Sequence, residues 1–111
     1  MSYTPKYIPY NKTIPELKER YLLLRERIRV VFDPVLAKIE SEQDLSEKFR
    51  KGNEVTNKIL EMTEPVRNNL HKINQNLPRG NFEIVDREIE SCREQLNILE
   101  SKIIELEQQS K

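Results

Sequence analysis

An uninterrupted apolar heptad pattern fills the last third of this 111-residue chain. Its apolar residues recur at alternating steps of three and four positions. Only an α-helix packed along its length against other helices requires that spacing, because it keeps one narrow stripe facing the partner. The stripe is therefore our candidate seam for self-association or partner binding, and it comprises Phe82, Val85, Ile89, Cys92, Leu96, Leu99, Ile103 and Leu106.

Three isoleucines off this seam, Ile84, Ile98 and Ile104, make the stripe wider than that of a bare two-stranded coil. A wider stripe needs a second helical neighbour. The segment 79–111 also carries three more acidic than basic residues, whereas residues 1–33 carry three more basic than acidic ones. We therefore expect the seam first to close a bundle with its own chain, and only the remaining surface to meet a partner.

Composition limits the chain to one domain with a thin core. Leu, Ile, Val and Phe account for 32 of its residues, which is above the level at which disorder is expected. Charged residues make up 34%, and the mean hydropathy is −0.76. No apolar run approaches the roughly 20 residues that cross a bilayer, and the N-terminus lacks the apolar core of a signal peptide. These features predict an intracellular protein, cytoplasmic or nuclear, without membrane insertion.

The first helix is expected over residues 14–41. Residues 13–16 match a capping box, and Pro15 fits the first turn, where a missing N–H costs nothing. Pro34 falls inside the same apolar pattern and removes one helical hydrogen bond. Because the stripe keeps its phase across Pro34, one kinked helix is favoured over a break with a restart at Asp33. The apolar series is Ile14, Leu17, Tyr21, Leu24, Ile28, Val31 and Val35, broadened by Leu22, Leu23, Val30, Phe32 and Leu36.

A second helix is expected over residues 45–77. No apolar residue falls between Ile39 and Leu45, and Asp44 opens a second capping box. A turn here is therefore favoured over a continuous, solvated helix. Pro65 would kink this helix. Its apolar residues are Leu45, Phe49, Val55, Ile59, Met62, Val66, Leu70, Ile73 and Leu77.

The strongest boundary is the turn at Pro78, which forbids continuation of the helix. Gly80 permits a positive φ there, and Asn81 can cap the next helix. A third helix is then expected over residues 82–109. The predicted fold class is all-α: residues 13–109 form an elongated antiparallel three-helix bundle, up-down-up, whose C-terminal helix packs in coiled-coil fashion.

Residues 1–12 are expected to form an extended arm, since Pro5 and Pro9 push the residues before them into extended geometry. The arm is either a flexible tail or strap on the bundle, or a linear motif that docks in a partner's groove. The tail or strap is favoured, because chain termini are poorly ordered unless they are tied down. The candidate motif residues are Tyr3, Tyr7 and Tyr10.

Residues that could carry chemistry are few. A single histidine, His71, and a single cysteine, Cys92, exclude a zinc site of the usual Cys/His type within one chain. Gly52 and Gly80 stand alone, so no glycine-rich phosphate loop exists. Cys92 lies in the seam and is expected to be a buried, poorly reactive thiol. We therefore expect no catalytic residue, no metal, no cofactor and no enzymatic activity.

One basic concentration lies in the first helix, and two interpretations of it compete. It could pair with the acidic third helix, or it could bind nucleic acid or an acidic partner. The first is favoured, since no aromatic residues interleave to stack on bases. The candidate basic patch comprises Lys18, Arg20, Arg25, Arg27 and Arg29.

The leading hypothesis is a non-enzymatic helical interaction protein, a small subunit or adaptor of a larger intracellular assembly. It would form homo- or hetero-oligomers with protein partners through coiled-coil-type packing. One alternative is a nucleic-acid-associated protein that uses the basic patch of the first helix. Another is a small chaperone from a phage, virus or secretion system.

Overall fold

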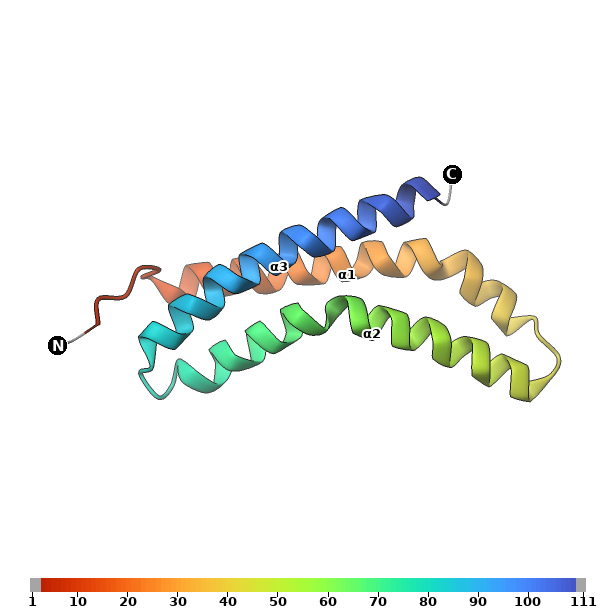
Figure 1. The fold of residues 1–111 in the computed structure, drawn as a ribbon, viewed down its shortest axis with the longest axis horizontal. Coiled ribbons are helices and arrows are strands. Elements are labelled where there is room, and N and C mark those ends of the chain that lie inside the picture. Colours follow the sequence, from red (N-terminus) through yellow and green to blue (C-terminus); the bar gives the residue numbers. More distant parts are fainter. Residues whose placement is uncertain (1–2, 110–111) are drawn as a thin grey trace.

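Three long helices make up the computed structural model, which describes residues 3–109 (Figure 1). They are α1 (Tyr10–Glu40), α2 (Leu45–Asn76) and α3 (Phe82–Gln109). α1 and α3 run in the same direction and α2 runs in the opposite direction, in an elongated molecule that measures 63 × 28 × 17 Å. The prediction of an all-α, elongated three-helix bundle is confirmed.

α1 begins at Tyr10, four residues before the predicted start. Pro9 is its N-cap residue, and the Pro9 carbonyl accepts hydrogen bonds from amides of the first turn. The predicted capping box at Thr13 is wrong, because the Thr13 hydroxyl donates to the carbonyls of Tyr7 and Pro9 instead. The earlier start has a tertiary cause: the ring of Tyr10 stacks on Phe82 of α3, with 5.7 Å between the ring centroids.

Both turns between helices fall where the sequence predicts them. Asp44 caps α2 by accepting hydrogen bonds from two amides of its first turn, at 2.9 and 3.4 Å. Gly80 in the second turn has a φ of 73°, which glycine adopts readily because it has no Cβ. α1 runs without interruption through Pro34, and α2 through Pro65. The kinks at these two prolines and the coiled-coil character of α3 stay predictions.

One cluster of apolar side chains along the bundle forms the core. Six of the eight seam residues of α3 are at most 1% exposed, so the seam is used to hold the chain's own helices. The stripe of α1 follows the prediction as far as Ile28, after which Phe32 is buried in place of Val31. The buried apolar residues are Ile14, Leu17, Tyr21, Leu24, Ile28, Phe32, Ile39, Val55, Val66, Ile73, Val85, Ile89, Cys92, Leu96, Leu99 and Ile103.

A polar contact joins α2 and α3 inside this core. The amide nitrogen of the buried Asn69 donates to the Glu88 carboxylate at 2.8 Å and to the Ser91 hydroxyl at 3.1 Å. The Lys72 ammonium lies 3.8 Å from the same carboxylate. The buried Asn69 amide reaches these partners in only one register of α2 against α3. It therefore favours that register over a shifted one.

At the end of the bundle where the chain turns from α1 into α2, α3 stops before the other two helices. The last residue of α3, Gln109, lines the same cavity as Phe32 of α1, whereas α1 continues to Glu40. Roughly eight residues of α1, about 12 Å at 1.5 Å per residue, therefore extend past α3. Figure 1 shows α3 ending short of the α1–α2 turn. We call this region, residues 32–61, the open end.

Shortening a buried side chain should be far more costly than shortening an exposed one on the same helix. Ile28→Ala is expected to lower the free energy of unfolding by about 3 kcal/mol, because it leaves a cavity at a fully buried site. Leu23→Ala, at an exposed site, should cost less than about 1 kcal/mol. Urea denaturation measures both. Equal losses would mean that α1 packs through a different face.

Candidate functional site

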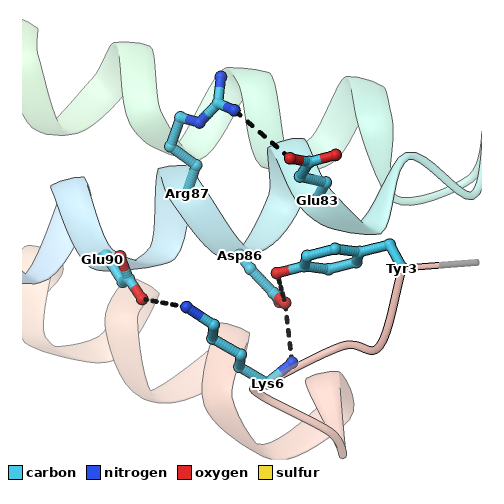
Figure 2. A pocket seen from close by; sticks show the side chains of 6 residues that line it. All are labelled: Tyr3, Lys6, Glu83, Asp86, Arg87 and Glu90. Atoms are coloured by element: carbon cyan, nitrogen blue, oxygen red, sulfur yellow. Dashed lines mark hydrogen bonds and ion pairs between the residues drawn. The ribbon is translucent and has the colours of Figure 1, made fainter.

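An N-terminal strap, residues 3–9, is held against α3 by one buried carboxylate (Figure 2). Asp86 is only 2% exposed. It accepts hydrogen bonds from the Tyr3 hydroxyl at 2.6 Å and from the Lys6 backbone amide at 2.8 Å. A third bond comes from the Tyr10 hydroxyl, at 2.7 Å. Asp86 therefore joins the strap and the first turn of α1 to α3.

One helical turn further on, Glu90 holds the next part of the strap. It accepts a hydrogen bond from the Tyr7 hydroxyl at 3.0 Å, and its carboxylate lies 3.8 Å from the Lys6 ammonium. The Arg93 guanidinium carbon lies 4.9 Å from the centroid of the Tyr7 ring, in cation–π geometry. All three tyrosines of the candidate linear motif thus bind carboxylates of α3.

The hydrogen bonds of the strap shift the pKa values of Asp86 and of the tyrosines that bind it. Burial is the largest influence on Asp86 and opposes its ionisation, but the bonds from Tyr3, Lys6 and Tyr10 together lower its pKa below 3.8. The bond to Asp86 is the main reason that the pKa of Tyr3 rises to about 12. The pKa of Tyr10 also rises, first through burial and then through its bond to Asp86. Near neutral pH an ionised acceptor therefore faces protonated donors.

A cavity of about 180 Å³ lies beside the strap. In Figure 2 its charges are paired with one another: the Arg87 guanidinium lies 3.9 Å from Glu83, and Lys6 lies beside Glu90. The strap already occupies the Asp86 oxygens, so the arrangement holds a segment of chain. Across residues 3–109, no group of three His, Cys, Asp or Glu side chains is placed to hold a metal ion.

Sequence reasoning did not single out Asp86 as the anchor of the strap. One signal was available, because Asp86 directly follows the seam residue Val85 and so lies at the edge of the buried stripe. A carboxylate at such an edge is rarely buried unless it is paired. The same reasoning shows why the tyrosines, which are hydrogen-bond donors with apolar rings, suit this position.

The structure divides the candidate basic patch. Arg27 lies 2.6 Å from Glu107, and Arg20, one heptad earlier on α1, lies 3.9 Å from Glu100. The expected pairing of α1 with acidic α3 is therefore present at these two arginines. Arg29 pairs within α1. The remaining members, which form no ion pair with residues 3–109, are Lys18 and Arg25.

Cys92 is fully buried at the centre of the seam. Burial raises the pKa of its thiol to about 11. The thiolate is the reactive form of cysteine, and a raised pKa keeps the thiol protonated. Cys92 is therefore an unreactive core residue.

A groove opens between α1 and α2 at the open end. Two cavities of about 560 and 270 Å³ lie along it. Val35 lies one heptad after Ile28 on the same face of α1, yet Val35 is 43% exposed and Ile28 is 0% exposed. The difference arises because α3 covers Ile28 but ends before Val35. We call this feature the α1–α2 groove, and its apolar lining is Phe32, Val35, Ile39 and Val55.

Comparison with known proteins finds no match for the chain: no protein-family model, no curated protein and no solved structure matches it. Within residues 3–109, no helix is both long and apolar enough to cross a bilayer.

Removing the Asp86 carboxylate should release the strap. Asp86→Ala deletes the acceptor of three hydrogen bonds, so we expect the free energy of unfolding to fall by about 1–3 kcal/mol. Hydrogen exchange at the Lys6 amide should lose its protection. Glu94→Ala, on the exposed face of α3, is the control and should change neither quantity. Continued protection of Lys6 in Asp86→Ala would mean that other contacts hold the strap.

The strap should stay docked over a wide middle range of pH. The pKa of Asp86 is lowered, so its contribution is present above 3.8 and is lost as pH falls through the folded value. The pKa of Tyr3 is raised, so its contribution is present below 10.0 and is lost as pH rises through about 12. NMR of the tyrosine ring carbons measures both limits. Release near neutral pH would contradict these assignments.

Proposed function

We propose that this protein is a non-enzymatic helical interaction module, a small subunit or adaptor that binds other proteins by helix packing. The observation that carries the proposal is the open end, where α1 and α2 extend beyond α3 and leave apolar surface uncovered. The heptad seam of α3 is already buried inside the chain, with six residues at most 1% exposed. A partner would therefore bind elsewhere than at the seam.

The exposed apolar residues of the open end support this proposal. Val35 lines the α1–α2 groove, and Leu45 and Phe49 near the start of α2 are 66% and 68% exposed. Exposed apolar side chains such as Leu22 and Ile98 also lie elsewhere on the bundle, but Val35 lies in a concave surface with an apolar lining, which is typical of binding sites. Nothing comparable supports binding of nucleic acid, because α3 engages Arg20 and Arg27 of the basic patch.

A charge placed in the groove should abolish partner binding without unfolding the protein. Val35→Glu introduces that charge, and Val30→Glu, at another exposed valine of α1, is the matched control. The measurement is co-purification from the cells that produce the protein, with sedimentation across a range of concentrations to detect self-association. We expect wild type and Val30→Glu to associate in the same way, and Val35→Glu to lose that association.

One combined result would overturn the proposal. If all three proteins recover the same material and all sediment as monomers, the open end binds nothing. A partner lost in both valine variants would mean that the outer face of α1 is also required.

A further inference from the structure

We propose that the α1–α2 groove binds an amphipathic helix with acidic flanks, presented by another protein and lying in line with α3. This inference rests on the proposed function and names the kind of partner. The shape of the groove, the charges around it and the burial of the chain's own α3 stripe favour this occupant.

The groove continues the channel that already holds α3. A cavity of about 220 Å³ borders the last turn of α3, is lined by Leu106 and Gln109, and shares Phe32 with the large cavity of the groove. Val35 continues the face of α1 on which Ile28 packs. α1 and α2 pack on α3 along most of their length, and they keep the same relative position beyond the end of α3. The uncovered stretch of about 12 Å accommodates about two helical turns.

The unpaired lysines around the groove favour an acidic partner. Lys38 borders it on α1, Lys58 on α2, and Lys102 lies at the end of α3. None of the three forms an ion pair with residues 3–109. α3 itself shows the matching arrangement, since its Glu107 meets Arg27 of α1 at 2.6 Å.

Acidic side chains also line the groove. They weaken the preference for an acidic partner but do not reverse it. Glu54 is already paired with Arg50 at 2.7 Å, while Glu61 and Glu105 form no ion pair with residues 3–109. Lys51 pairs with Glu42 at 3.0 Å. Among the unpaired groups at the groove, three are therefore cationic and two are anionic. A flanking carboxylate next to Lys38 or Lys58 would be attracted most strongly.

A second copy of the chain has no free helix of this kind to offer. α3 is its acidic helix with an apolar heptad stripe, and that stripe is buried in its own bundle. Exposing it would mean unfolding the core. The geometry therefore points to a helix from a different protein.

A peptide of residues 95–109 is the probe, because it reproduces the acidic end of the helix that α1 and α2 already hold. Labelled with a fluorophore and titrated with the whole protein, it should show saturable binding by anisotropy. Val35→Glu should weaken binding about tenfold or more, since one buried valine is worth about 1.5 kcal/mol. Val30→Glu should stay within about twofold. A control peptide carries lysine in place of Glu100, Glu105 and Glu107.

The control peptide should bind several-fold more weakly, because it faces the groove lysines with like charge. Circular dichroism checks that each variant is folded. If Val35→Glu does not fold, the exposed double variant Lys38→Glu with Lys58→Glu tests the same groove, and it should reverse the preference between the two peptides.

Each other outcome overturns the inference in a distinct way. Binding that Val35→Glu leaves unchanged would mean that the peptide displaces α3 instead of occupying the groove. Equal binding of both peptides would remove the acidic preference. A wild-type dimer that Val35→Glu dissociates would assign the groove to a second copy, which overturns this inference but supports the proposed function. A monomer that binds the acidic peptide supports the inference and removes only self-association from the proposed function.

Discussion

Burial of one apolar stripe on α3 determines the arrangement of the whole molecule. Six seam side chains are almost completely excluded from water by α1 and α2. Each buried aliphatic side chain contributes about 1.5–3 kcal/mol, whereas an exposed ion pair contributes about 1 kcal/mol or less. The pairs of α1 arginines with α3 glutamates are therefore consequences of this packing. They lie where the two helices already meet.

Packing of α3 also makes the two ends of the bundle different. The turn at Gly80 sets where α3 begins, and the contacts of Tyr10 with Phe82 and Asp86 place the first turn of α3 beside the start of α1. α3 has 28 residues and α1 has 31, and α3 ends beside Phe32, eight residues before the end of α1. One end is consequently closed by the strap on Asp86. The other end keeps only two helices and the α1–α2 groove.

The strap illustrates how a polar group is accommodated at the edge of an apolar core. A carboxylate as buried as Asp86 would destabilise the fold if it had no partner, because its charge has lost its water. Two tyrosine hydroxyls and one backbone amide replace that water, and the tyrosine rings cover apolar surface at the same time. Polar and apolar requirements are met by the same segment.

The sequence by itself determined the helices, the two turns and the stripe that forms the core, since helix periodicity, Asp44 and Gly80 act over a few neighbouring residues. It misplaced the start of α1, because the contact of Tyr10 with Phe82 spans most of the chain and outweighs the local capping signal at Thr13. Only the tertiary structure decided that Asp86 anchors the strap and that Val35 stays exposed while Ile28 is buried. Both depend on the offset between helices, which is set by the summed packing of distant side chains and by no local pattern.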